Sequence, residues 1–473
     1  MKLRAIAVLL FLSVSLLPPC VRSAAQETQE DSPQTDATVS PTDDIDVINA
    51  KIKQLEDGGT LYFSPGLYHF NKSLEIMNKS ITLRGSESTQ KEDVILTSDV
   101  QHTIQILGIY FEENSNFVVT IEGITVRNDY QPEQFFAEYF RRCVIKPYKW
   151  LHGLSSVTSP GDDLLRSASG EGDESNQEPL QSPPLINCAI KQCGGYLDVI
   201  SCELSAPKGI AVNVVDNFPG RLSELPPAGE LVPYVVDTSV KDSTICDSLT
   251  AIKTSRPLLL CDSIISNNKE GISLLAKSRG KIDNVQFTEN GIGFSADDSS
   301  AASIGTCVFL GNNTAISSRG ENCCLQVNQS RFEQNKANDI SCLAGTLFAL
   351  SCTHSGGEGN AYNCLSPNIF LSDTSIEGYP VGIHCPRHGA CQARNVSIKD
   401  CTTGIRCFHT QPMLIQDSTI TDCEQGVCYE IQDSDITPPF GRYERNSFTD
   451  TSTPWNIPSC PRTVHRRDNE PNQ

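Results

Sequence analysis

Positive charge is scarce in this chain of 473 residues: 37 Lys and Arg stand against 57 Asp and Glu, which gives a formal net charge of −20 at pH 7. A negative surplus of this size repels polyanions, so we predict that nucleic acid is not a partner.

Long apolar runs are scarce as well. The run at residues 5–17 is too short to span a bilayer, and no later run is apolar enough to do so. We therefore predict no membrane anchor.

The first residues nevertheless have the layout of a cleavable secretory signal, because Lys2 and Arg4 precede the apolar run and small residues follow it. We expect residues 1–25 to be removed as a signal peptide and the protein to be secreted and extracellular. Residues 26–43 are polar and acidic and contain proline, a composition that cannot bury a core. They are predicted to be a disordered leader.

The 20 cysteines favour an oxidising compartment, which agrees with secretion. Cysteines that recur at a fixed spacing can form disulfides or stack as small buried thiols, and the sequence leaves both alternatives open. Five Asn-x-Ser/Thr sequons would carry N-linked glycans in a eukaryotic secretory pathway. The sequons begin at Asn71, Asn78, Asn312, Asn328 and Asn395.

A repeat can be counted from about residue 258 onward. Each unit has an apolar residue, a second apolar residue five positions later, and in most units Asn or Cys three positions after that. The last members are Asn268, Asn290, Asn312, Asn335, Tyr379, Cys401 and Cys423. They follow one another at a nearly constant interval, except that the gap between Asn335 and Tyr379 is twice as long as the others. A degenerate copy is therefore expected near residue 357.

A unit of this length is too short for a four-stranded propeller blade and lacks the spacing of a leucine-rich repeat. It suits one coil of three short strands, and coils stacked about 4.8 Å apart would share one apolar core. The sequence therefore predicts an all-β fold, a right-handed parallel β-helix of about 22 residues per coil. Because Asn tolerates a left-handed bend and can bond an identical neighbour, we expect the asparagines to form a structural ladder that Cys401 and Cys423 continue.

The β-helix domain is predicted at residues 44–455, with insertions at about 130–184 and 216–241 and a C-terminal tail at 456–473. A short helix before Gly58 should cap its N-terminal end, because apolar residues recur there near helical spacing. These residues are Ile45, Val47, Ile48, Ile52 and Leu55.

Two segments do not fit the repeat. Residues 338–366 place Cys342, Cys352 and Cys364 among Gly and Ser, so we expect an irregular loop held by disulfides. Ile190 and Leu204 both look like unit positions but lie closer together than one unit length, which allows no clean coil assignment.

The segment from Ile48 to Tyr68, followed by Ser80-Ile-Thr-Leu-Arg-Gly85, resembles the start of pectin-lyase-like right-handed β-helix proteins. Later repeats such as Val285-Gln-Phe-Thr-Glu-Asn-Gly-Ile are similar to the parallel β-helix repeats of carbohydrate-binding proteins and sugar hydrolases. The resemblance implies a helix-capped solenoid. It also implies a glycan or polysaccharide partner, held in a groove along the stacked strands.

Hydrolysis of such a polymer needs two carboxyl groups, one protonated and one ionised. Asp297 and Asp298 are the best adjacent pair. The Asn-Thr-Asp, Gly-His-Gly and Arg-Ile-Lys elements that accompany the paired aspartates of polygalacturonases are absent, and a solvated turn is the simpler interpretation. Catalysis by this pair is therefore a hypothesis without a complete motif.

A second group of candidates lies in His384-Cys-Pro-Arg387-His388-Gly-Ala-Cys391, whose residue types bind zinc or supply a base beside an arginine. Structural cysteines and histidines in a turn explain the same letters. The Trp-Ile-Asp-His signature of pectate lyases and the Asp-Pro-His-Asp of alginate epimerases are missing. We predict no metal site and no cofactor, with calcium at acidic turns as the open alternative.

Several functions agree with these features. The first is a secreted protein that binds a glycan or polysaccharide and, as a polysaccharide lyase or glycoside hydrolase, also cleaves it. The alternative is a non-catalytic surface or matrix protein that uses the solenoid as a rigid scaffold for adhesion or display. A third is recruitment of a protein partner by the acidic stretch at residues 155–184. Because no catalytic motif is complete, the sequence leaves open whether the chain is an enzyme.

Overall fold

The computed structural model describes residues 36–86, 89–107, 117–130, 187–215, 237–320, 322–365, 368–386, 390–408, 413–430, 441–456, 464–467 and 470–471. The predicted signal peptide, most of the predicted leader and nearly all of the two predicted insertions lie outside these residues. Arg387 and His388 also lie outside them. No helix in the described residues is long and apolar enough to cross a membrane.

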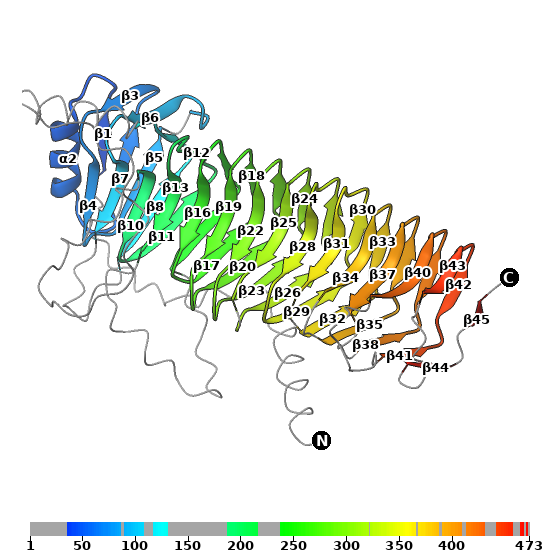
Figure 1. Cartoon of the computed structure of the whole chain (residues 1–473). Coiled ribbons are helices and arrows are strands. Elements are labelled where there is room, and N and C mark those ends of the chain that lie inside the picture. Colours follow the sequence, from blue (N-terminus) through cyan, green and yellow to red (C-terminus); the bar gives the residue numbers. More distant parts are fainter. Residues whose placement is uncertain are drawn as a thin grey trace, which may run out of the picture. The chain divides into compact units, whose positions relative to one another are not determined.

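Three parallel sheets make up the described chain, and each coil adds one strand to every sheet (Figure 1). From β2 onward, neighbouring strands of a sheet are three strands apart in the sequence, which is the connectivity of a parallel β-helix. Leu258 pairs with Gly280 and Gly280 with Ala302, so the coils here repeat at the interval counted from the sequence. The predicted fold class, an all-β parallel β-helix with a short N-terminal helix, is confirmed.

Sheet A has 16 strands, and its first and last members lie outside the predicted domain boundaries. Residues 37–39 of the expected leader pair with β2, and residues 464–467 of the expected tail pair with β41. The β-helix is therefore longer than predicted at both ends. The strands are β1 (Ala37–Val39), β2 (Thr60–Phe63), β5 (Ile81–Gly85), β8 (Val118–Glu122), β11 (Tyr196–Ile200), β14 (Thr238–Lys241), β17 (Leu258–Cys261), β20 (Arg279–Asp283), β23 (Ala301–Gly305), β26 (Cys324–Asn328), β29 (Thr346–Leu350), β32 (Asn368–Ser372), β35 (Ala390–Arg394), β38 (Met413–Gln416), β41 (Gly441–Glu444) and β44 (Val464–Arg467).

Sheet B has 15 strands, most of them only three residues long with the middle side chain buried in the core. The strands are β3 (Gly66–Phe70), β6 (Val94–Ser98), β9 (Thr125–Asn128), β12 (Glu203–Ser205), β15 (Thr244–Cys246), β18 (Ile264–Ser266), β21 (Gln286–Thr288), β24 (Val308–Leu310), β27 (Arg331–Glu333), β30 (Thr353–Ser355), β33 (Ser375–Glu377), β36 (Ser397–Lys399), β39 (Thr419–Thr421), β42 (Ser447–Thr449) and β45 (Glu470–Pro471).

Sheet C has 14 strands. Ile190 lies in sheet C and Leu204 in sheet B, so the two residues are closer together in the sequence than one full coil. The strands are β4 (Leu74–Met77), β7 (His102–Leu107), β10 (Cys188–Cys193), β13 (Ile210–Val214), β16 (Thr250–Thr254), β19 (Glu270–Leu274), β22 (Ile292–Ala296), β25 (Thr314–Ser318), β28 (Asn338–Cys342), β31 (Asn360–Cys364), β34 (Val381–Cys385), β37 (Thr403–Phe408), β40 (Gln425–Glu430) and β43 (Thr453–Asn456).

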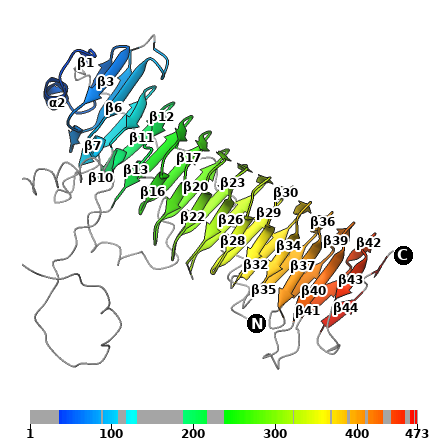
Figure 2. The same ribbon diagram turned by 45° about the horizontal axis from the view of Figure 1, so that its top comes forward.

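The N-terminal helix α2 runs from Ile45 to Gln54 and packs beside the first coils (Figure 2). It begins where the Asp44 side chain accepts a hydrogen bond from the Asp46 amide at 3.3 Å, which satisfies one of the unpaired N–H groups of the first turn. Ile45, Ile48 and Ile52 are buried as predicted, and so is Leu55 after the helix. Val47 is 45% exposed, contrary to the expectation, because it lies on the outer side of the helix.

An asparagine ladder runs inside one corner of the solenoid. The side-chain amide of Asn268 donates to Oδ1 of Asn290 at 3.0 Å, Asn290 donates to Asn312 at 3.0 Å, and Asn312 donates to Asn335 at 3.1 Å. The same Oδ1 atoms accept the backbone amides one coil below at 2.9 to 3.0 Å. Each buried side chain therefore satisfies polar groups that water does not reach.

The left-handed bend of this corner lies one residue earlier than expected. Positive φ angles occur at Asn267 (59°), Glu289 (55°), Gly311 (65°) and Gln334 (53°), and not at the ladder asparagines. The side-chain amide of the ladder residue points into the core, whereas the residue before it adopts the left-handed bend. That bend position holds Glu, Gln and Gly in addition to Asn.

The described part of the predicted irregular segment, residues 338–365, is not an irregular loop. It forms β28, β29, β30 and β31, one regular coil and the start of the next, with Gly357 at the degenerate ladder position. The expectation of an irregular loop is therefore wrong. No disulfide is formed among the described cysteines. Cys342, Cys352 and Cys364 are buried in the core, and burial raises the pKa of the Cys342 thiol to about 12.

A polar cluster stands in the core where the ladder ends. Asp339 is fully buried and accepts hydrogen bonds from Asn335 Nδ2 at 2.8 Å and from the Tyr379 hydroxyl at 2.5 Å. His354 Nδ1 lies 2.8 Å from Oδ2 of Asp339, and His354 Nε2 lies 2.8 Å from the Tyr362 hydroxyl. The buried carboxylate, imidazole and hydroxyls thus find partners inside an apolar core.

The position of Asp339 holds a small residue in the neighbouring coils. Ala315 and Ala361 occupy the same position in β25 and β31, where only small side chains fit in the other coils. His354 replaces the Phe of the preceding coils and stacks on Phe332 with a centroid distance of 4.5 Å. The cluster therefore ends the asparagine ladder and the phenylalanine stack at the same place.

We predict that Asp339→Ala lowers the free energy of unfolding by about 3–5 kcal/mol, because it leaves the buried polar atoms of His354 and Tyr379 without their partner. Urea unfolding followed by circular dichroism measures the change. Glu358→Ala, at an exposed position two residues before β31, is the control and should change the free energy by less than about 0.5 kcal/mol. Equal effects of the two substitutions would contradict the interpretation.

His102 gives the fold a pH dependence. The side chain at the start of β7 is 5% exposed, and its Nδ1 has no hydrogen-bond partner among the described residues. Burial, with the charge of Lys191 as a second cause, lowers the pKa of His102 to about 4. The unfolded chain binds this proton near pH 6.5 and the folded chain does not, so stability is lost as the pH falls from 6.5 toward 4.

We expect His102→Gln to remove this share of the pH dependence. Urea unfolding between pH 5 and pH 7 should show a free energy that rises with pH in the wild type and rises less steeply in the variant. Parallel curves would show that His102 titrates at its ordinary pKa.

Candidate functional site

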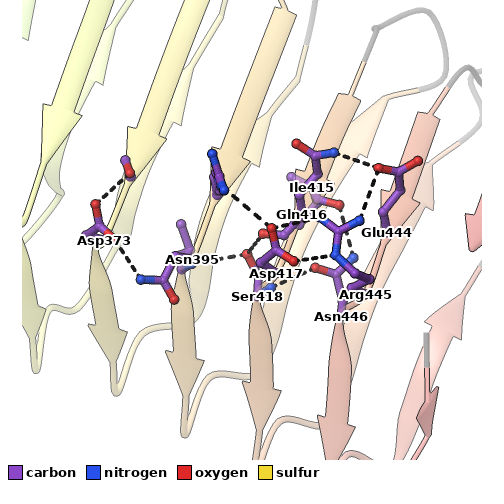
Figure 3. A network of polar contacts seen from close by, with 12 residues as sticks. Asp373, Asn395, Ile415, Gln416, Asp417, Ser418, Glu444, Arg445 and Asn446 are labelled. Atoms are coloured by element: carbon purple, nitrogen blue, oxygen red, sulfur yellow. Dashed lines mark hydrogen bonds and ion pairs between the residues drawn. The ribbon is translucent and has the colours of Figure 1, made fainter. Parts of the chain in front are cut away.

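A polar groove lies along the corner where strands of sheet A end and the chain turns toward sheet B (Figure 3). It has a volume of about 520 Å³. The groove follows the last residues of β32, β35, β38 and β41, so four successive coils contribute to it. Its lining residues are Ser372, Asp373, Arg394, Asn395, Asp417 and Arg445.

The local backbone explains which residues line the groove. Asp373, Asn395, Asp417 and Arg445 each occupy the left-handed bend of their coil, with φ between 52° and 53°. Asn and Asp tolerate this conformation better than most residues with a side chain. The bend and the register therefore place polar side chains at the same corner, one coil after another.

Asp373 is held by its neighbours on two sides. Asn395 Nδ2 donates to one carboxylate oxygen at 2.6 Å, and Ser372 Oγ donates to the other at 2.7 Å. These hydrogen bonds, the one from Asn395 being the larger cause, lower the pKa of the Asp373 carboxyl below its usual value.

Asp417 is held by an arginine of the next coil. Arg445 donates through Nε to Oδ1 at 2.6 Å and through Nη2 to Oδ2 at 2.9 Å, a bidentate contact that lowers the pKa of the Asp417 carboxyl. Arg394 lies on the other side, with its Nε 3.6 Å from Oδ2. The Arg394 side chain is 74% exposed, so much of its guanidinium faces solvent over the groove.

An aromatic pair stands beside the groove on the outer face of sheet A. Phe348 of β29 pairs with Phe370 of β32, and their rings stack with a centroid distance of 4.8 Å and an angle of 10°. Phe370 is two residues before Ser372, so both side chains face outward from one strand. Leu350, the partner of Ser372 in the register, is 44% exposed. Apolar and polar surface therefore meet at this place.

The carboxyl groups of the groove accept hydrogen bonds that favour their ionised form. Asp373 and Asp417 both have lowered pKa values, and the same holds for Glu444 behind them, where hydrogen bonds from Gln416 and then Arg442 are the causes. A glycosidase needs one carboxyl group that keeps its proton near neutral pH. The arrangement is suited to hydrogen bonding with a ligand rather than to protonating a leaving group.

Asp297 and Asp298 do not belong to the groove. They lie in the turn between β22 of sheet C and β23 of sheet A, at a different corner of an earlier coil. Asp298 is exposed, and its Oδ1 accepts a hydrogen bond from the Asn322 amide at 3.3 Å. The pair is part of a turn that the next coil contacts, and it joins no cluster of three or more His, Cys, Asp or Glu among the described residues.

His384 lies on sheet C, near Arg406 and Glu430 of the following coils. Burial, followed by the charge of Arg406, lowers the pKa of the His384 imidazole. Cys391, by contrast, is 1% exposed and belongs to β35 in the core of sheet A. The part of the chain that the structure describes contains no group of three or more His, Cys, Asp or Glu that would hold a metal ion.

The sequons have very different surroundings. Asn71 and Asn78 are exposed in the first coils, Asn328 is half-buried, and Asn395 is exposed in the groove. Asn312 is fully buried, and its amide nitrogen is the donor of the ladder. A glycan on Asn312 would remove one of the hydrogens that the ladder uses.

The chain matches no family model and no curated protein sequence. Among solved structures, a GH87 α-1,3-glucanase catalytic domain in complex with tetrasaccharides is 12% identical with a TM-score of 0.39, covering 96% of this chain and 70% of that one. The catalytic unit of a GH87 α-1,3-glucanase from Streptomyces thermodiastaticus is 11% identical, TM-score 0.39, with 92% and 69% covered.

The Dettilon tailspike protein is 10% identical to this chain with a TM-score of 0.39, and the match covers 81% of this chain and 66% of the tailspike. Likenesses this weak carry no inference about activity. The fold assignment therefore rests on the strand pairing, and the function must be argued from the residues of this chain.

We predict that Arg445→Gln returns the pKa of the Asp417 carboxyl toward its ordinary value of 3.8, because the bidentate contact is the main cause of the shift. Carbon-13 NMR titration of labelled aspartate measures it. Arg394→Gln is the matched control and should change the pKa less, since Arg394 lies 3.6 Å away. Equal shifts in the two variants would contradict the geometry described.

Proposed function

We propose that this chain is a secreted β-helix protein that binds a glycan or polysaccharide in the polar groove and on the aromatic pair beside it. The observation that carries the proposal is the meeting of stacked Phe348 and Phe370 with the hydrogen-bonding groups of Asp373, Arg394 and Asn395 on one rigid face. Sugar rings present C–H groups on their faces and hydroxyls at their edges, so they need both kinds of surface.

Rigidity supports the proposal as well. The groove side chains stand at strand ends of a stacked solenoid, and their hydrogen bonds to one another fix their directions before a ligand arrives. Side chains that are already oriented lose little conformational freedom on binding. The resemblance of the first coils to pectin-lyase-like proteins, and the apolar N-terminus that resembles a secretory signal, agree with an extracellular glycan partner.

Binding without cleavage is the form of the function that the groove chemistry favours, because the carboxyl groups in it have lowered pKa values. We expect incubation of the purified protein with plant, algal and animal polysaccharides to release neither reducing ends nor unsaturated products. Release of either product would replace the binding proposal with an enzymatic one.

The proposal is tested with unglycosylated protein on a glycan array, followed by calorimetry with the oligosaccharide that binds most strongly. Phe370→Ala should weaken its affinity at least about tenfold, or about 1.4 kcal/mol, because it removes the apolar platform. Lys281→Ala changes the same outward column of sheet A in an earlier coil and should leave the affinity unchanged. Absence of binding to every glycan would favour the scaffold function, and equal loss in both variants would place the site elsewhere.

A further inference from the structure

We propose that Asn395 is an N-glycosylation site whose glycan occupies the polar groove, so that attachment of the glycan closes the groove to other ligands. The inference rests on the proposed function, because closing the groove has a consequence only if the groove binds a ligand. It adds a second state to that site: a glycosylated form in which the groove is closed, beside the unglycosylated form in which the groove is open and binds the glycan.

The sequon lies at the right place for this role. Asn395 is followed by Val396, which is buried, and by Ser397, which is exposed at the start of β36. Asn395 itself is exposed at the left-handed bend, where the side chain projects from the corner. In Figure 3 it lies between Asp373 and Asp417, in the middle of the groove.

The side-chain nitrogen of Asn395, which would receive the sugar, is held at the wall of the groove. Asn395 Nδ2 donates to Asp373 Oδ1 at 2.6 Å. The amide nitrogen carries two hydrogens, so one can be replaced by a sugar while the other keeps the bond to Asp373. The first sugar then starts inside the groove, next to Arg394 and Asp417, which also line it.

The other sequons do not have this position. Asn312 is fully buried in the ladder, and Asn71 and Asn78 belong to the first coils. Asn328 ends β26, two coils before the groove begins at Ser372. Among the sequon asparagines, all of which the structure describes, Asn395 is the one that lines the groove.

The modification is a glycosyl transfer from a lipid-linked oligosaccharide pyrophosphate. The Asn395 amide nitrogen forms a bond to the first carbon of the sugar, and the bond between that carbon and the pyrophosphate oxygen breaks. The lipid pyrophosphate leaves with the electron pair, and the amide proton passes to a base of the transferase. No oxidant or reductant takes part.

The matched variant is Ser397→Ala, which abolishes the sequon and leaves Asn395 and every lining residue of the groove in place. Wild type and variant are secreted from eukaryotic cells, and their glycopeptides are mapped by mass spectrometry. We expect a glycan on Asn395 of the wild type and none on the variant. An unmodified Asn395 in the secreted wild type would overturn the inference.

Closure is measured with phenylglyoxal, which reacts with exposed guanidinium groups and requires no knowledge of the ligand. Arg394, which is 74% exposed, should react at least about fivefold more slowly in the glycosylated wild type than in Ser397→Ala. Arg279, exposed on β20 away from the groove, should react equally in both and serves as the internal control. Equal reaction of Arg394 in the two proteins would overturn the inference.

The closure of the groove by a glycan and the proposed function can be refuted independently of each other. If Ser397→Ala binds an array glycan at least about tenfold more tightly than the glycosylated wild type, both stand. Protection of Arg394 without binding of any glycan by Ser397→Ala would leave the closure in place and refute the proposed function. Equal glycan affinity of both forms would keep the function and refute the closure.

Discussion

The structure depends on in-register stacking of coils, in which each buried polar group finds its partner one coil away. The asparagine ladder is the clearest case: Asn290 accepts the backbone and side-chain amides of Asn268 and donates its own side-chain amide to Asn312. A shift of register by one residue would turn these side chains outward and leave buried amides without partners. Apolar columns such as Phe287 and Phe309 follow the same register, so core packing and hydrogen bonding select one alignment.

The same register organises the surface. Phe348 and Phe370 are direct partners in the register, and the strands that carry the groove residues pair in the same register. Columns of side chains on the outer surface are therefore as regular as those in the core. Departures from regularity are localised. In the core, Asp339 ends one ladder and gathers a buried polar cluster, and at the corner Arg445 takes the place that Asp417 and Asn395 hold in earlier coils.

The fold was predictable because the inward column is chemically uniform: apolar residues and asparagines recur at a spacing that only a coil of constant length explains. The groove was missed although its signal was present, since Asp373, Asn395 and Asp417 recur at the same interval as the buried column. The buried column stands out in the sequence because apolar residues mark it, whereas exposed polar residues at a fixed interval look like ordinary turns. His384 and Asp297 are candidates by residue type alone, and type does not tell which corner a side chain occupies.

A buried ladder of amides holds the coils in register. Urea unfolding of Asn290→Ala tests it most directly, with Asn284→Ala, at an exposed bend on the same coil, as the reference. We expect the free energy of unfolding to fall by about 2 kcal/mol or more in Asn290→Ala, because the amides of Asn268 lose their acceptor in the core. A loss no larger than that of Asn284→Ala would contradict it.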